Sequence, residues 1–231
     1  MRLAAARTCA SETDMLIESC AVPPFEKNGY VVACPVTGDA IVIDPGAEVE
    51  QLIAIVRRTG VTVRYIMLTH SHLDHISGCN EAKAEWGVPL VLHRDELFLY
   101  ERAVQQGIAF GIPMRPQPPI DAWFDSQPHW TFGRCTVVAH HTPGHSPGQV
   151  CLQVGQEGQR ADLLFVGDTL FAGSIGRTDL PGGNLDALLR SVREVLFPLG
   201  DDCRVFPGHG PATTIGEERR SNPFLAGLDT H

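Results

Sequence analysis

The chain has 231 residues, of which 43% are hydrophobic and 19% charged, so it is long enough for one compact domain with a substantial core. Its 18 Lys and Arg residues against 27 Asp and Glu residues give a formal charge of −9, and no basic run offsets it. This balance counts against a nucleic-acid partner, because an acidic surface repels a phosphate backbone. No apolar run approaches the roughly 20 residues of a membrane span, so no membrane partner is expected.

The N-terminus and the cysteines both favour a cytoplasmic protein. Arg2 and Arg7 flank only a short apolar run, which makes a poor signal peptide. The seven cysteines are scattered and never spaced as C-x-x-C, which favours free thiols in a reducing compartment. Regular patterning begins near Met15, so we expect residues 1–13 to be a flexible extension and residues 14–231 to form one domain.

The first half of the chain alternates between apolar runs and helical spacing. A polar turn at Thr37–Asp39 separates two apolar runs, which predicts a hairpin, and a helical pattern then ends near Gly60. The predicted elements are strands at Tyr30–Ala33 and Ala40–Ile43, a helix at 48–58, a buried strand at Val63–Thr69, a helix at Gly78–Trp86 and a strand at Pro89–Leu92.

The second half repeats this alternation after an irregular region. Residues 107–128 are rich in proline, which predicts a surface loop or lid. Strands separated by helices indicate an α/β layered domain. The elements predicted beyond the loop are strands at Cys135–His140, Gln149–Val154 and Leu163–Gly167, a helix at Leu185–Phe197 and a last strand at Arg204–Phe206.

The strongest chemical signal is the segment HSHLDH at residues 70–75, directly after a buried strand. Alternate residues of an extended segment point the same way, so His70 and His72 can share one ion. Asp74 and His75 follow as the chain turns and can face a neighbouring ion. Three histidines and an acid on one tight loop would repel one another and lack partners without a cation, so the segment predicts a metal site.

Three further apolar strands end in Gly or Pro followed by one residue of ligand type. These residues are His145, Asp168 and His209, which stand in the segments HTPGH, GD and PGHG. Ligands on loops at strand ends are a rigid way to bring distant positions together. We therefore expect the three residues to complete the site.

The complete set contains five histidines and two aspartates, which suit two divalent metal ions. Zinc is the expected metal, and iron or manganese would also accept these ligands. A carboxylate shared by two ions about 3.5–4 Å apart would make a site that activates water. We interpret Asp44 as a turn residue that can also support a ligand. The histidines interpreted as ordinary polar residues are His93, His129, His140, His141 and His231.

At this point the residues resemble the metallo-β-lactamase superfamily, whose H-x-H-x-D-H signature matches residues 70–75. The resemblance covers residues 15–225 and implies an α/β fold, a four-layer αββα sandwich with metals at one edge of its two sheets. It also implies a ligand set. One metal would be held by His70, His72 and His145, the other by Asp74, His75 and His209, with Asp168 bridging.

Within that superfamily the chain is most similar to short bacterial glyoxalase II-like proteins. The resemblance is carried by GDTLF at 167–171, by GRTD at 176–179, by PGHGP at 207–211 and by NPFL at 222–225. It implies hydrolysis of S-D-lactoylglutathione to D-lactate and glutathione. Full-length glyoxalase II carries a helical C-terminal domain that helps to hold glutathione, and the segment after His209 is too short for it. We expect thioester chemistry without tight glutathione selectivity.

The hypothesis for the mechanism is attack by a metal-bridging hydroxide on the carbonyl of a small-molecule thioester. Asp74 would orient the hydroxide or take its proton, and the thiolate would leave without acid assistance. Arg177 is the candidate for binding a substrate carboxylate, because its planar guanidinium binds carboxylates in a bidentate manner. The alternative for Arg177 is an ion pair with Asp179.

Other functions remain as alternatives. A persulfide dioxygenase would use a single iron held by His70, His145 and Asp168, and a lactone hydrolase would use the same two-metal site. A β-lactamase is disfavoured by the position of Asp168, a nuclease by the acidic charge, and a non-enzymatic binding module by the presence of all seven ligands. The sequence does not predict an oligomeric state.

Overall fold

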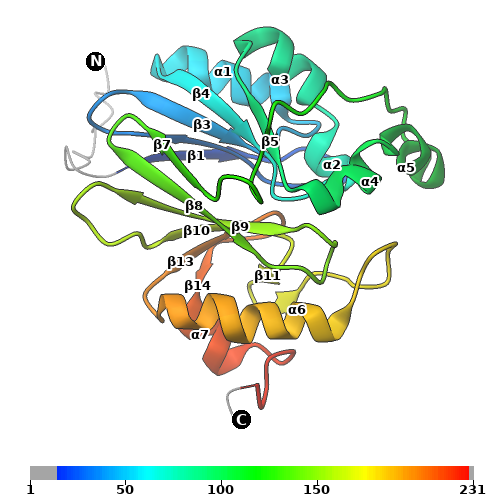
Figure 1. Ribbon diagram of the computed structural model, residues 1–231, viewed down its shortest axis with the longest axis vertical. Coiled ribbons are helices and arrows are strands. Elements are labelled where there is room, and N and C mark those ends of the chain that lie inside the picture. The colour runs from blue at the N-terminus through cyan, green and yellow to red at the C-terminus, as the bar shows by residue number, and fades with distance from the viewer. Residues whose placement is uncertain (1–14, 229–231) are drawn as a thin grey trace, which may run out of the picture.

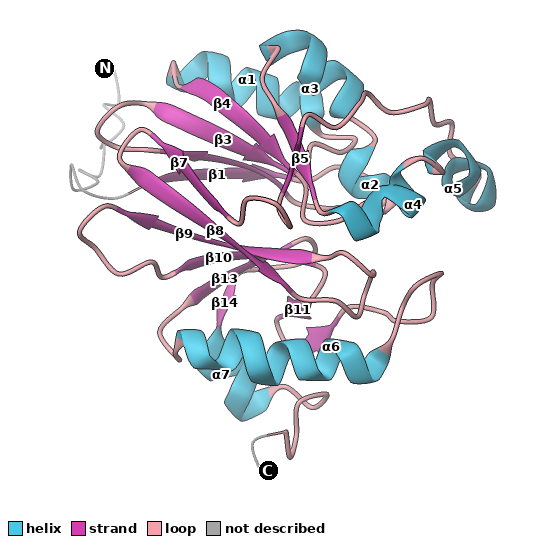
Figure 2. Cartoon of the chain, viewed as in Figure 1, coloured by secondary structure: helices cyan, strands magenta, loops and turns pink. Residues whose placement is uncertain are grey.

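Two six-stranded sheets pack face to face and carry helices on both outer surfaces (Figure 1). The chain is described by a computed structural model over residues 15–228, so the extension predicted at residues 1–13 lies outside the described residues. Figure 2 shows the four layers in order, with helices, sheet, sheet and helices from top to bottom. The predicted four-layer αββα sandwich is confirmed. Within residues 15–228, no helix is both long and apolar enough to cross a bilayer.

The first sheet begins with antiparallel strands and continues with parallel ones. Helices α1 (Val49–Thr59) and α3 (Cys79–Trp86) cover its outer face. Helix α1 forms because its apolar residues recur at helical spacing on one buried face, and Gly60 ends it in the left-handed conformation. The strands, in sheet order, are β1 (Leu16–Cys20), β2 (Gly29–Ala33), β3 (Asp39–Ile43), β4 (Thr62–Met67), β5 (Leu90–Leu92) and β6 (Ala122–Trp123).

The second sheet is antiparallel except for one parallel pair, β10 with β13. Its outer face is covered by α6 (Leu185–Ser191), which continues through a π turn (Val192–Leu196) and a 3-10 turn (Phe197–Leu199). Helix α7 (Ile215–Ser221) lies beside it. The strands, in sheet order, are β14 (Thr213–Thr214), β13 (Arg204–Pro207), β10 (Leu163–Gly167), β9 (Val150–Gln156), β8 (Cys135–His141) and β7 (His129–Phe132).

Short elements connect and complete the two halves. Helix α2 (Leu73–Ile76) follows β4, and the segment between β5 and β6 carries the 3-10 turn η1 (Arg94–Glu96), helix α4 (Leu97–Tyr100) and helix α5 (Ala103–Phe110). A separate two-stranded ribbon lies between β10 and α6. Its strands are β11 (Leu170–Phe171) and β12 (Ser174–Ile175).

The main core lies between the sheets and also positions the site. The rings of Phe165 and Phe206 stack with centroids 4.9 Å apart, and Tyr30 meets Phe165 edge-on at 5.1 Å. The hydroxyl of Tyr30 donates to the carbonyl of Pro207 at 2.7 Å. A strand of the first sheet therefore fixes the end of a strand of the second, immediately before His209.

The predicted loop at 107–128 is partly wrong. Helix α5 continues to Phe110 and β6 occupies Ala122–Trp123, so the irregular stretch is shorter than predicted. The sequence did not predict helix α5 because it contains Gly107, a residue that disfavours helices. Glycine is required at this position because a Cβ would lie 2.4 Å from the carbonyl oxygen of Ile112. The edge strands β1, β7 and β14 were also not predicted, because short edge strands carry a weak apolar pattern.

A buried ion pair supports the turn that follows β3. Lys27 and Glu48 are only 2% and 1% exposed, and the Lys27 ammonium contacts both the Glu48 carboxylate and the carbonyl of Asp44. Glu48 also accepts a hydrogen bond from the amide of Gly46 at 3.0 Å. Removing one partner of such a pair leaves an uncompensated charge in the interior.

Replacing Lys27 tests this support. We expect Lys27→Met to lower the free energy of unfolding by about 3–5 kcal/mol, because Glu48 would remain buried without its cation. The control is Arg57→Met, since Arg57 pairs with Glu85 on the surface, and its effect should be below about 1 kcal/mol. Urea denaturation measures both. Equal losses for the two variants would show that Glu48 is satisfied without Lys27.

Candidate metal centre

All seven residues predicted from the sequence meet at one edge of the sandwich, where strands of both sheets end. The first four follow β4, and the others follow β8, β10 and β13. They fall into two groups of three with Asp168 in contact with both. The residues are His70, His72, Asp74, His75, His145, Asp168 and His209.

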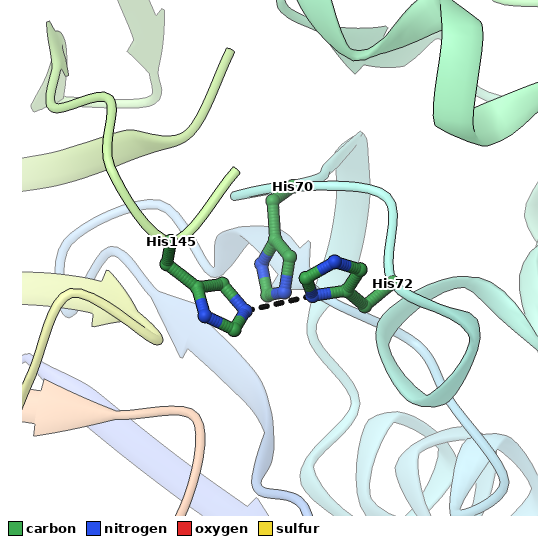
Figure 3. Close-up of side chains that lie close together, drawn as sticks. All are labelled: His70, His72 and His145. Atoms are coloured by element: carbon green, nitrogen blue, oxygen red, sulfur yellow. Dashed lines mark hydrogen bonds between the residues drawn. The ribbon is translucent and has the colours of Figure 1, made fainter. Parts of the chain in front are cut away.

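The first group is His70, His72 and His145, and all three side chains are buried. Figure 3 shows their rings turned toward one another, two from the segment after β4 and one from the loop after β8. One nitrogen from each ring lies within 4.8 Å of the other two. His72 Nδ1 is 2.7 Å from His145 Nε2, so nitrogens from two separate loops meet at this point.

The second group is Asp74, His75 and His209. His209 Nε2 lies 3.1 Å from Asp74 Oδ2, and His75 Nε2 lies 3.7 Å from the same oxygen. Asp168 reaches both groups, because its Oδ1 is 3.4 Å from His75 Nε2 and its Oδ2 is 3.6 Å from His145 Nε2. One carboxylate therefore lies between two sets of donors.

The outer nitrogen of each of four rings is fixed by a partner outside the cluster. His145 Nδ1 donates to the carbonyl of Arg177 at 2.7 Å, and His209 Nδ1 donates to that of Phe25 at 3.2 Å. His75 Nδ1 donates to Asp44 at 2.9 Å, and His70 Nδ1 contacts the hydroxyl of Thr69 at 3.1 Å. Since these nitrogens carry the hydrogen, the other nitrogen of each neutral ring keeps a lone pair that faces the cluster.

The inner atoms fit a cation because they lack any other partner. His70 Nε2, His75 Nε2 and Asp168 Oδ1 are buried and make no hydrogen bond with other described residues. Buried polar atoms are rarely left unpaired, and each one costs about 1–3 kcal/mol. Imidazole nitrogens and a carboxylate oxygen are the donor set of zinc and iron centres. The residues present therefore fit two divalent metal ions.

The electrostatics differ between the two groups. Burial and the neighbouring imidazoles hold the pKa of His70 well below its ordinary value, and burial lowers the pKa of His72 to about 3. These rings are neutral, as ligands must be. Burial would also lower the pKa of His75, but the carboxylates of Asp74 and Asp168 outweigh it and raise this pKa to about 10. The carboxylates thus create a strongly negative potential at the second group, which favours a cation there.

Asp44 supports His75 directly and His70 through Thr69. Its carboxylate accepts from the amide and hydroxyl of Thr69 at 2.7 and 2.6 Å, and also from His75. The backbone of Asp44 is left-handed, with φ 50°, a conformation that Asp tolerates better than most residues. The predicted turn residue therefore also orients the ligands.

Glu96 joins the two ligand loops and was not predicted. Its fully buried carboxylate accepts from the amide of Ser71 at 2.8 Å and from the amide of Gly148 at 2.8 Å. One loop belongs to the first sheet and the other to the second. The sequence gives no signal for this role, since an acid near a helix start is ordinarily a surface residue.

Arg177 lies at the rim of the site. Its guanidinium forms a bidentate ion pair with Asp179, both contacts at 2.7 Å, and its side chain is 56% exposed. It also lines the cavity above the metal centre. Both readings of Arg177, an ion pair and a group facing substrate, are thus compatible with its position.

Two histidines interpreted as ordinary polar residues in the sequence form another donor group with Asp95. His93, Asp95 and His141 could hold a cation, and the rings of His93 and His141 stack with centroids 4.3 Å apart. Asp95 and His141 are exposed, and His141 Nε2 already donates to the carbonyl of Pro147 at 3.0 Å. Two of its three members are therefore exposed, and the group shares no residue with the seven of the main centre.

The chain is similar to known proteins over most of its length. A profile of the Metallo-beta-lactamase superfamily matches residues 22–209. The chain is 36% identical over 217 residues to the hydroxyacylglutathione hydrolase GloC of Haemophilus influenzae, covering 91% of this chain and 98% of that protein. It is similar to the structure of the BLEG-1 B3 metallo-beta-lactamase, with TM-score 0.84, 36% identity, and coverage of 92% of this chain and 100% of that one. It is also similar to TTHA1623 in a di-iron-bound form, with TM-score 0.79, 37% identity, and coverage of 90% and 100%.

Asp44 provides a test of the metal centre that leaves the ligands intact. We expect Asp44→Asn to weaken metal binding about 10–100-fold, because the amide cannot accept all three hydrogen bonds that orient Thr69 and His75. The matched control is Asp39→Asn at the start of β3, the strand that leads to Asp44, where the carboxylate pairs with Arg64 at the surface. Metal content after dialysis against graded chelator measures the change. Equal metal retention in both variants would remove the supporting role of Asp44.

Proposed function

This chain belongs to the metallo-β-lactamase superfamily, and from that premise we propose that it is a two-metal hydrolase that cleaves a glutathione thioester such as S-D-lactoylglutathione. The observation that carries the proposal is Asp168, whose two oxygens reach ligands of both groups. Such a shared carboxylate is expected when two cations lie side by side. We propose zinc as the metal, with iron or manganese as alternatives.

The proposed roles of the residues follow from their positions. When bound, the two cations lower the pKa of a water molecule to about 7 and polarise the substrate carbonyl. Asp74 lines the cavity and its side chain is 13% exposed, so its carboxylate can orient the attacking water and hold its proton. A thiolate leaving group needs little protonation, because the pKa of a free thiol is about 8.5.

Glutathione thioesters are favoured by the likeness to GloC, whose name is hydroxyacylglutathione hydrolase. The likeness to BLEG-1, a B3 metallo-beta-lactamase, makes a β-lactam the second candidate. A lactone is the third. A single iron held by His70, His145 and Asp168 would serve a persulfide dioxygenase, but that reading leaves the assembled Asp74, His75 and His209 without a role.

The first test is turnover and metal content on the same sample. We expect two metal ions per chain, hydrolysis of S-D-lactoylglutathione without oxygen, and loss of activity with chelator. Asp168→Ala should reduce kcat at least 100-fold and lower the metal content below two, because the shared ligand is gone. His140→Ala is the control, since that ring pairs with Gln153 outside the centre.

The other outcomes identify the alternatives. If a β-lactam or a lactone is hydrolysed faster than the thioester, that compound class replaces the thioester as the proposed substrate. One iron per chain with oxygen consumption would indicate the persulfide dioxygenase. Full activity in the absence of any metal would overturn the proposal.

Arg177 provides a second test, of binding rather than chemistry. If its guanidinium binds a glutathione carboxylate, Arg177→Ala should raise KM about tenfold with little change in kcat. Asp179→Asn should lower KM, because it removes the competing carboxylate. Arg193→Ala is the control, since Arg193 pairs with Glu194 and does not line the cavity. Steady-state kinetics measure these changes. An unchanged KM in Arg177→Ala would show that Arg177 does not bind substrate and only forms the ion pair with Asp179.

A further inference from the structure

We propose that the segment between β5 and β6 forms an apolar wall for the acyl chain of the substrate, so that the preferred thioesters carry an alkyl or aromatic acyl group larger than lactoyl. The proposal rests on the proposed thioester hydrolysis and names its substrate class. We call this surface the acyl wall, and it consists of Phe98, Leu99, Ala109 and Phe110 on helices α4 and α5.

The acyl wall is one side of the cavity above the metal centre. This cavity has a volume of about 500 Å³, within the range of sites for small organic ligands. Asp74, His145 and Asp168 of the metal centre line the same cavity as the residues of the wall on α4 and α5. Phe25 and Leu73 add further apolar lining. A chain attached to a carbonyl at the metal centre would therefore lie against apolar side chains.

Two large side chains of the wall are left open to solvent. Phe98 is 54% exposed and Phe110 is 45% exposed, although both line the cavity. Exposed aromatic rings that line a cavity with a polar site favour an apolar ligand, because covering them removes apolar surface from water. Ile108 on the same helix is 77% exposed but does not line this cavity.

The four side chains of the acyl wall are all uncharged and apolar, so the wall suits an acyl chain better than the charged groups of glutathione. Glutathione carries two carboxylates and one ammonium group, which need ionic partners. The cationic group on the wall side is Arg102, whose guanidinium lies 3.9 Å above the ring of Phe98 and donates to the Phe98 carbonyl at 3.0 Å. The acids among the described lining residues are Asp74 and Asp168, which belong to the metal centre. Arg177, on the segment between β12 and α6, also lines the cavity and suits a glutathione carboxylate.

A lactoyl group would gain little binding energy from contact with the acyl wall. It has three carbons and a hydroxyl group, and a hydroxyl against phenyl rings loses its hydrogen bonds to water without replacement. For an unbranched acyl chain, each methylene that becomes fully buried should instead raise kcat/KM about threefold to fourfold. The wall therefore predicts a preference that rises with acyl length until the cavity is filled.

The test compares S-acylglutathiones on the metal-loaded protein, namely lactoyl, acetyl, butyryl, hexanoyl and octanoyl. We expect kcat/KM to rise at least 30-fold from acetyl to octanoyl. In Phe98→Ala and Phe110→Ala the ratio of octanoyl to acetyl should fall about tenfold. Ile108→Ala is the matched control, because it removes a similar exposed side chain from α5 outside the cavity, and its ratio should stay unchanged.

A second measurement separates binding from hydrolysis. S-methyl-, S-butyl- and S-octylglutathione are thioethers that cannot be hydrolysed, and calorimetry should show affinity rising with alkyl length in the wild type but much less in Phe110→Ala. If no thioester is hydrolysed, the proposed function is wrong, but this titration still shows whether the acyl wall binds alkyl chains. A flat dependence on length in both assays, or equal effects of Phe110→Ala and Ile108→Ala, would overturn the acyl wall.

Discussion

Buried ligand atoms without partners are the constraint on which the architecture depends. The outer nitrogens of four imidazoles bond to carbonyls, a hydroxyl or a carboxylate, so their inner nitrogens face the cluster, where His70 Nε2, His75 Nε2 and Asp168 Oδ1 make no hydrogen bond with the described residues. Neither protein nor a single water molecule can satisfy so many acceptors at once, whereas divalent cations can. The interior of the sandwich must therefore hold the loops rigidly enough for the cations to replace the missing hydrogen bonds.

That rigidity comes from contacts between segments far apart in the chain. Glu96 holds one loop from each sheet through backbone amides, and Tyr30 holds the end of β13 through Pro207. Close packing adds to these contacts. A Cβ at Gly208 would lie 2.2 Å from Asp168 Oδ1, so only glycine lets the loop after β13 approach this carboxylate. The glycine next to His209 is thus a steric requirement of the metal centre.

The main strands and the seven ligand candidates could be predicted because their signals are local. An apolar run followed by Gly or Pro and one ligand residue marks a strand end, and Asp44 follows β3 in a related pattern. Glu96 and Lys27 could not be predicted, since their partners lie elsewhere in the chain and surface acids and lysines look the same in a sequence. Helix α5 was missed because Gly107 lowers helix propensity, while the close approach of Ile112 requires it.

Metal binding and the proposed substrate specificity depend on different parts of this fold. The ligands occupy strand ends whose strands form the core between the sheets, so changing those strands would disturb both stability and metal binding. The acyl wall instead belongs to a connection outside that core, and Phe98 and Phe110 join no hydrophobic cluster among the described residues. Substitutions of Phe98 and Phe110 can therefore alter the accepted acyl group while the metal centre keeps its geometry. A sandwich built in this way can change substrates by surface substitutions that cost little stability.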